Sequence, residues 1–253
     1  MYDLQKANMW KRISAALFDS IILVILAVGL AFLLSTVLGY DGYTTRLETI
    51  SEAYEAEYQV DFDITASDYQ ALTEEGKKNY QDALDAFSTD SDSNYVYGMI
   101  VNLTFLIVTF SILIAFLLLE FLVPLLLGNG QTPGKKIFGI AVMREDGVKL
   151  SPILLFARTI LGKYTVETMV PVFILIMIYL NLMGVIGTVV IAGLLIAQLV
   201  LIIATRARTP IHDKLAHTVT VDLASQMIFD TPEELLEYKK RIHAEKVESE
   251  EYK

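Results

Sequence analysis

The stretch from Met9 to Leu38 constrains the fold more than any other part of the sequence. From Ile13 onward it carries a single formal charge, Asp19. About 20 apolar residues suffice to cross the hydrocarbon core of a bilayer as a helix. In such a helix Arg12 and Asp19 share one face, because seven residues make about two turns. A carboxylate at membrane depth costs about 2.5–3.5 kcal/mol, so we expect Asp19 to face protein or water.

The composition is that of a membrane protein. The 253 residues are 54% hydrophobic with a mean hydropathy of +0.48, which is too apolar for an ordinary soluble domain. Cysteine is absent, so disulfides, zinc–thiolate sites and thiol nucleophiles are excluded. Acidic residues concentrate in one segment, because residues 40–97 hold fourteen Asp or Glu against three Lys or Arg. No basic stripe indicates a nucleic-acid partner.

The hydropathy pattern predicts an all-α polytopic membrane protein with four transmembrane helices. The second helix covers about Met99–Leu127 and contains Glu120, and the apolar stretch at 165–204 suits two short spans with a turn at Asn181–Gly187. The chain then divides into the N-terminus and first helix (1–39), an acidic helical insert (40–98), the second helix (99–127), a polar connection (128–164), the third and fourth helices (165–205) and a charged C-terminal segment (206–253).

Local patterns predict smaller elements in the polar parts. Ile137–Met143, followed by Arg-Glu-Asp-Gly and then Val148-Lys-Leu, is typical of a short β-hairpin. Pro152–Lys163 is amphipathic, which predicts a helix lying in the membrane interface. In the insert, Ser67–Gln70 has the pattern of a capping box, and aromatic and aliphatic residues at helical spacing favour another helix at Thr45–Gln59.

The distribution of Lys and Arg predicts the orientation in the membrane. These residues gather before the first span, between the second and third, and after the fourth, whereas the acidic insert has few. The positive-inside rule therefore places both termini and the connection at 128–163 in the cytoplasm, and the insert on the other side. We expect a multi-pass protein of the cell membrane, with a cytosolic tail helix that begins at Thr231-Pro-Glu-Glu.

Two carboxylates are predicted at similar depth. Counted from the ends of their apolar stretches at roughly 1.5 Å per residue, Asp19 lies about 9 Å inside and Glu120 about 10 Å inside. Like charges that share a site often retain one proton, which suits the binding of a proton or a cation. The alternative is structural, with Asp19 meeting Arg158 or a polar group of another helix, and Glu120 pairing with Arg158 or Lys135.

Residues beyond the last span complete the candidate site. Asp213 is expected either to close the site by pairing with Arg12 or to cap a turn. His212 and His217 lie five residues apart, which suits a helical metal pair poorly, so no metal site is predicted. The segment Gly128–Lys136 lacks the spacing of a phosphate loop and indicates a tight turn with cationic anchors for lipid head groups. We expect no cofactor and no enzymatic activity, because no nucleophile–His–Asp constellation is visible.

Three blocks of sequence occur in a characteristic order: Arg12-Ile-Ser-Ala-Ala-Leu-Phe-Asp19, Gly130-Gln-Thr-Pro-Gly-Lys135 and His212-Asp213-Lys-Leu-Ala-His-Thr218. Together they resemble the RDD family of integral membrane proteins, which is named for an Arg and two Asp. The resemblance places the Arg of the family on Arg12 and its two Asp on Asp19 and Asp213. It covers about 10–38 and 99–222, and the insert at 40–97 departs from the usual short connection of the family.

The resemblance implies transport, because most of the family is described as candidate transporters and some members are reported as sodium/proton antiporters. Together with the embedded carboxylates, it predicts exchange of Na⁺ and H⁺ at Asp19 and Glu120, with Arg12, Arg158 and Asp213 tuning or gating the site. A eukaryotic relative acts as an adaptor in a membrane quality-control complex. The alternative is therefore a non-transporting adaptor with structural Arg/Asp pairs. Besides the lipid bilayer, we expect a homo-oligomer or a membrane-protein partner, because four spans are few for a transporter.

Overall fold

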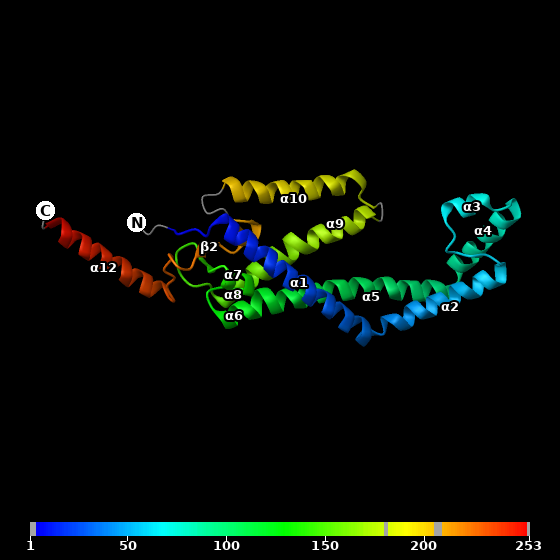
Figure 1. Ribbon diagram of the computed structural model, residues 1–253, viewed down its shortest axis with the longest axis horizontal. Helices are drawn as coiled ribbons and strands as arrows, with labels where there is room; N and C mark the ends of the chain where they lie inside the picture. The colour runs from blue at the N-terminus through cyan, green and yellow to red at the C-terminus, as the bar shows by residue number, and fades with distance from the viewer. Residues whose placement is uncertain (1–3, 180–181, 205–208, 252–253) are drawn as a thin grey trace. The chain divides into compact units, whose positions relative to one another are not determined.

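The computed structural model describes residues 4–179, 182–204 and 209–251 (Figure 1). Within these residues, four helices are long and apolar enough to cross a membrane: Met9–Leu38, Ser91–Leu127, Pro152–Ile178 and Gly184–Ala204. The predicted all-α polytopic class is thereby confirmed, while the orientation of the termini stays a prediction. The chain forms two compact units, one made of Met1–Ala27 with Ile112–Lys253 and the other of Val28–Ser111.

The first span is helix α1 (Met9–Leu38), as predicted. The second span is continuous through α5 (Ser91–Phe116), a π-helical stretch η1 (Leu117–Leu122) and α6 (Val123–Leu127), so it begins earlier than the predicted Met99.

The third span is continuous through α8 (Pro152–Ala157), a second π-helical stretch η2 (Arg158–Met169) and α9 (Val170–Tyr179). The helix predicted to lie in the interface at Pro152–Lys163 is therefore the first part of the third span, not a separate element. Helix α10 (Gly184–Ala204) packs antiparallel to α9 (Figure 1). The turn predicted at Asn181–Gly187 extends too far, because α10 already begins at Gly184, and Asn181 lies outside the described residues.

Each π-helical stretch contains an acidic residue that is followed, four residues later in the sequence, by a proline. Pro124 has no N–H to donate to the carbonyl of Glu120, four residues earlier, and the Thr159 hydroxyl donates to that carbonyl instead at 2.9 Å. Pro171 stands in the same relation to Glu167. Missing donors of this kind loosen the regular helical ladder, and π-helical turns are a common response. Both spans are thus widened where they carry an acidic side chain.

The two-stranded sheet differs from the predicted hairpin. Strand β1 (Ile140–Arg144) pairs antiparallel with β2 (Thr218–Asp222) from far along the chain, and only an isolated bridge joins Met143 to Lys149. Strand β2 reads Thr-Val-Thr-Val-Asp, and side chains alternate between the faces of a strand. Its valines therefore pack in a hydrophobic cluster with Ala141 and Met143, while its threonines face the opposite way.

Short segments at both ends of the chain complete this unit. Residues 5–7 pair with the free edge of β2, through the bridge Lys6↔Val221. Helix α12 (Pro232–Glu251) begins as predicted, because the Thr231 hydroxyl accepts the N–H of Glu234 at 3.2 Å. Two short helices, α7 (Pro133–Ile137) and α11 (Ile211–Leu215), precede β1 and β2 respectively.

The second unit contains the acidic insert, which folds as predicted into helices: α2 (Tyr40–Tyr58), α3 (Ala66–Ala71) and α4 (Glu74–Thr89). Its aromatic rings form a cluster, in which the ring centroid of Phe87 lies 5.8 Å from that of Tyr54 and 5.7 Å from that of Phe62. The capping box predicted at Ser67–Gln70 is wrong by two residues, because Thr65 caps α3.

Candidate functional site

Asp19 is buried on α1 and is held by the start of α7. Its side chain exposes about 5% of its surface. One carboxylate oxygen accepts the backbone N–H of Gly134 at 2.8 Å, and the other accepts the Thr132 hydroxyl. Thr132 also caps α7, since its hydroxyl accepts the N–H of Lys135. This carboxylate on a candidate membrane span is thus buried with two hydrogen-bond donors in place, as the cost of burial requires.

This contact depends on small residues on both helices. A Cβ atom at Gly134 would lie 2.5 Å from the carbonyl oxygen of Ala15 and 2.8 Å from Asp19 Oδ1. Ala15 itself is 1% exposed. The small Ala15-Ala16 pair of α1 therefore allows a close approach, as its composition suggests. The approaching element is the short helix α7.

Glu120, from η1, lies among three cationic side chains. Lys163 of η2 donates a hydrogen bond to Oε1. Lys135 Nζ lies 3.5 Å from Oε2, and Arg158 Nη1 lies 3.9 Å from it. Among the residues that the structure describes, none forms a hydrogen bond with Oε2, although this atom is buried. The site thus contains a buried carboxylate oxygen with cations nearby but no direct donor.

Lys135 links the two carboxylates. Its Nζ lies 3.8 Å from Asp19 Oδ2 in addition to its contact with Glu120, and it donates a hydrogen bond to the Thr132 hydroxyl at 3.0 Å. Its side chain is 9% exposed. Burial lowers the pKa of Lys135 to about 8, because the attraction of Glu120 does not fully offset the loss of water.

Arg158 and Asp213 form a second buried centre next to the first. Arg158 Nε donates to Asp213 Oδ1 at 2.7 Å, and Arg12 Nη2 lies 3.8 Å from Oδ2. The hydroxyls of Thr218 and Thr220, on one face of β2, also donate to this carboxylate. Burial alone would raise the pKa of Asp213, but the charges and hydrogen bonds around it, Arg158 foremost, hold the pKa below its ordinary value.

A third cluster of polar side chains joins the last two spans to α11. Glu167 Oε2, from η2, forms a hydrogen bond of 2.7 Å with His212 Nδ1. The other carboxylate oxygen of Glu167 accepts hydrogen bonds from the His212 backbone N–H and from the side-chain amide of Gln198. A Cβ at Gly162 would lie 2.5 Å from the Cβ of His212, so glycine permits this contact. Burial lowers the pKa of His212 below its ordinary value. The ring is therefore neutral near pH 7.

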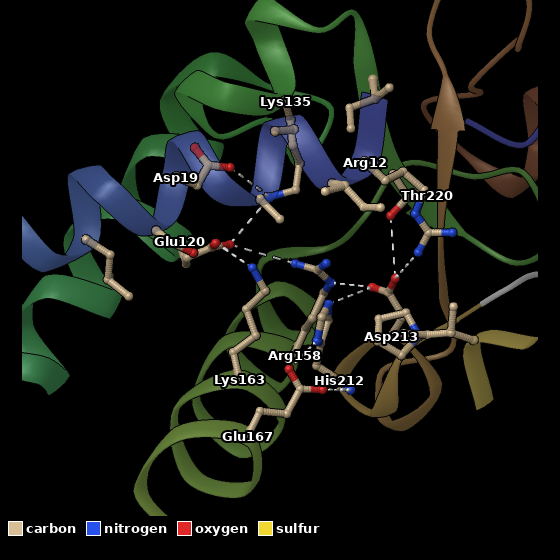
Figure 2. A pocket seen from close by; sticks show the side chains of 18 of the residues that line it. Arg12, Asp19, Glu120, Lys135, Arg158, Lys163, Glu167, His212, Asp213 and Thr220 are labelled. Carbon is tan, nitrogen blue, oxygen red and sulfur yellow. Dashed lines mark hydrogen bonds and ion pairs between the residues drawn. The ribbon is translucent and has the colours of Figure 1, made fainter. Parts of the chain in front are cut away.

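These groups surround one cavity of about 420 Å³ (Figure 2). Figure 2 shows the side chains converging from α1, η1, α7, η2 and α11. Among the described residues, the walls carry four cationic side chains and four carboxylates, namely Arg12, Lys135, Arg158 and Lys163 against Asp19, Glu120, Glu167 and Asp213. Their formal charges balance. The same part of the chain contains no cluster of three His, Cys, Asp or Glu side chains that suits a metal ion.

Comparison with known proteins places the chain in a family. The model of the RDD family matches residues 6–217. The chain belongs to the RDD family. No curated protein and no solved structure matched it. The match spans all of the cavity-lining residues up to Asp213, and it ends just before β2, whose threonines bind Asp213.

In this RDD protein the three sequence blocks meet around the cavity. Asp19 of the first block is held by Thr132 and Gly134 of the second. Arg12 of the first block faces Asp213 of the third at 3.8 Å, the pairing that the sequence suggested.

Some predicted pairings are corrected. Of the partners predicted for Asp19, Arg158 is wrong, because Arg158 pairs with Asp213, and a polar group of another helix is present in the form of Thr132 and Gly134. The alternative predicted for Glu120, pairing with Arg158 or Lys135, is present with both residues at ion-pair distance, joined by Lys163.

Sequence reasoning missed Glu167, Lys163 and Thr132 as members of the site. A signal was present for Glu167. The strings Glu120-Phe-Leu-Val-Pro and Glu167-Thr-Met-Val-Pro place an acid four residues before a proline in two different spans. Strand β2 also had a signal, because Thr-Val-Thr-Val alternates with the period of a half-buried strand.

Proposed function

We propose that this RDD family membrane protein exchanges a monovalent cation for protons, with Asp19 and Glu120 as the carboxylates that hold the cation. The observation that carries this proposal is the cavity, which borders both carboxylates, each on a helix long and apolar enough to cross a membrane. Ionisable residues within transmembrane segments mark ion pathways by default, since their burial is costly. Na⁺ is the cation that we propose first.

The contacts at the carboxylates support a monovalent ion. Lys135 places one ammonium group within 3.8 Å of Asp19 and 3.5 Å of Glu120. A single positive charge is therefore already accommodated between these two side chains. Glu120 Oε2 is buried and accepts no hydrogen bond among the described residues, although Lys135 and Arg158 lie within ion-pair distance of it, so this oxygen has room to bind a cation.

We propose that Arg12, Arg158 and Asp213 gate or tune this site. Arg158 is the bridge between the two centres, because it donates to Asp213 at 2.7 Å and lies 3.9 Å from Glu120. Arg12 Nη2 lies 3.8 Å from Asp213 Oδ2, so its charge also acts on this carboxylate.

We propose further that the protein lies in the cell membrane with both termini in the cytoplasm, and that it works as a homo-oligomer or with a membrane-protein partner. It is proposed to bind and move ions without enzymatic chemistry. The large apolar side chains on the outer faces of α1 and α10 suit contact with lipid or with another membrane helix; Phe32, Val185 and Ile203 are examples.

The competing function is that of an adaptor with a purely structural charge network. One observation favours it: Asp213 is fully buried and has charge-assisted and hydroxyl hydrogen bonds, as a structural lock requires. The two functions predict different effects of removing the negative charge of Asp19.

Proton flux in liposomes distinguishes the two functions. Purified protein is reconstituted with a pH gradient, and Na⁺, K⁺ or Li⁺ is added while internal pH is followed. We expect Na⁺-dependent flux that is lost in Asp19→Asn, because the amide keeps the shape and the Gly134 contact but not the charge. The control is Asp146→Asn, which removes an exposed carboxylate paired with Arg144.

Two outcomes would count against the transport proposal. One is wild-type protein that is folded in the liposomes but shows no cation-dependent flux. The other is Asp19→Asn protein with intact flux but a reduced amount in the membrane, which is the result of a structural role.

A further inference from the structure

We propose that the cavity binds an organic ammonium ion that carries a short alkyl chain, and that Na⁺ is a weaker ligand of the same site. This inference rests on the proposed exchange function and names the class of cation that is exchanged. The ammonium group lies at Glu120, and the alkyl chain lies against the apolar part of the cavity wall.

The cavity is larger than a metal ion needs. Its volume of about 420 Å³ lies within the range of about 300–1,000 Å³ that is typical of pockets for organic molecules. Such pockets combine apolar side chains with a few polar groups that orient the ligand. The cavity has both kinds of group, because its charged side chains share the wall with Ile13, Leu23, Phe116 and Ile202. A bare sodium ion would leave most of this space to water.

Apolar side chains of the wall lie one helical turn away from the two carboxylates. Leu23 follows Asp19 by four residues on α1, and Phe116 precedes Glu120 by four residues in the second span. Four residues correspond to about 6 Å along a helix. A ligand whose charged end binds at Glu120 therefore has apolar surface about one turn away, where a short alkyl chain can be buried.

The free oxygen of Glu120 favours an ammonium group over a metal ion. Oε2 is buried and accepts no hydrogen bond among the described residues, whereas Lys163 donates to Oε1. Buried polar atoms usually have a hydrogen-bond partner, and an ammonium ion supplies the N–H donor that a metal ion lacks. Lys135 shows that this chemistry suits the site, since its own ammonium nitrogen lies 3.5 Å from Oε2 and 3.8 Å from Asp19 Oδ2 (Figure 2).

The cations around Glu120 favour a ligand with an apolar part. Lys135, Arg158 and Lys163 all lie at ion-pair distance from this carboxylate and oppose the entry of another positive charge. A metal ion has only its charge to offset that repulsion. An alkylammonium ion also gains about fourfold in affinity for each methylene group that it buries, and this gain does not depend on the charges.

Binding of a series of alkylammonium ions tests the proposal. The full chain in detergent at pH 7 is titrated with methylammonium, propylammonium or pentylammonium chloride, and binding is measured as thermal stabilisation, with and without NaCl. We expect the affinity to rise about fourfold for each methylene group, and Na⁺ to compete with every member of the series. The control ligand is 1-pentanol, which has the chain without the charge and should not stabilise the protein.

Two neighbouring residues of α1 give a matched pair of variants. Leu23→Ala removes part of the apolar wall, so the ratio of the pentylammonium affinity to the methylammonium affinity should fall about tenfold. Val24 is 60% exposed and lies outside the cavity wall, so Val24→Ala should keep the wild-type ratio. A general loss of stability would affect both ligands alike, which is why the ratio reports on the wall itself.

The outcomes separate the class of cation from the function on which it rests. Equal affinities for methylammonium and pentylammonium, binding of 1-pentanol as tight as that of pentylammonium, or an unchanged ratio in Leu23→Ala protein overturns the alkylammonium site and leaves Na⁺ exchange standing. Wild-type protein that binds neither an alkylammonium ion nor Na⁺, and that shows no Na⁺-driven flux, overturns both.

Discussion

At the scale of single residues, the Arg158–Asp213 pair has the largest energetic consequence. Both side chains are buried, with exposures of 2% and 1%. If one of the two charges is removed, the other stays buried and is not solvated by water. Such a pair stabilises the folded protein little relative to an apolar pair, but breaking it is strongly destabilising.

Asp213→Asn should therefore destabilise the protein by about 3–5 kcal/mol, because Arg158 would keep a buried charge without its hydrogen-bonded carboxylate. Thermal unfolding in detergent measures this loss. The matched control is Asp230→Asn, because Asp230 is 72% exposed and pairs with Lys149 at the surface. Equal stability of the two variants would contradict the buried lock.

Lys135 gives the stability a pH dependence of defined sign. Its pKa is about 8 in the folded chain, whereas the ordinary pKa of a lysine side chain in water is 10.5. Between these values the unfolded chain binds a proton that the folded chain does not. Stability should therefore rise with pH across this window. Unfolding of wild type and Lys135→Gln at pH 8 and pH 10 tests this, and an equal change in both proteins would contradict it.

At the scale of elements, the approach of α7 to α1 positions the first carboxylate. The N–H of Gly134 donates to Asp19 at 2.8 Å, and no Cβ fits at this glycine. Helix α7 is only five residues long, so it depends on this contact and on its Thr132 cap more than on its own hydrogen bonds.

Gly134→Ala should push α7 away from Asp19 and cost about 1–3 kcal/mol of stability through overpacking. Na⁺-driven flux should fall with it, since both donors to Asp19 belong to this segment. Gly98→Ala on α5 is the control, because a Cβ there meets nothing within 4 Å. Full flux in Gly134→Ala protein would show that the capped geometry of Asp19 is dispensable.

Elements with strong local periodicity could be predicted from the sequence, and those with distant partners could not. The apolar spans and the cap at Thr231 depend on neighbours in sequence, and the structure contains them. The hairpin prediction was confirmed only in part, because a single antiparallel bridge joins Met143 to Lys149, while the main partner of β1 is β2, which is far along the chain. Backbone pairing over such a distance leaves no local signal beyond the alternation within each strand.

The same difference between local signals and distant partners decides which residues of the candidate site could be predicted from the sequence. Asp19 and Glu120 stand out because a charge within an apolar run is costly. Some of their partners do not, because Thr132 and Lys163 are ordinary polar residues in polar or amphipathic sequence, whereas Lys135 and Arg158 were predicted as partners of Glu120. Which cation meets which carboxylate depends on packing between segments, and the two prolines that widen the helices shift that register further.

At the scale of the whole molecule, the cavity and the acidic insert belong to different compact units. Every residue that lines the cavity lies in the unit of Met1–Ala27 and Ile112–Lys253. The insert has a core of its own, with Phe87 between Tyr54 and Phe62. Exchange should therefore tolerate damage to the insert.

Phe87→Ala should loosen the insert and speed its proteolysis, because a ring is lost from the aromatic cluster, while Na⁺-driven flux stays at the wild-type level. Phe116→Ala is the reciprocal variant, since Phe116 lines the cavity and packs on Tyr164. It should alter flux and leave proteolysis of the insert unchanged. Loss of flux in Phe87→Ala protein would show that the insert takes part in exchange.

The balanced charges of the cavity make the central claim measurable. If one proton leaves for each monovalent cation that enters, no net charge moves in a cycle, and the membrane potential does no work on it. The measurement is Na⁺-driven proton flux in liposomes whose potential is clamped at a series of values with a K⁺ gradient and valinomycin. We predict the same rate at every potential, and a rate that rises or falls steadily with potential would contradict one-for-one exchange at this site.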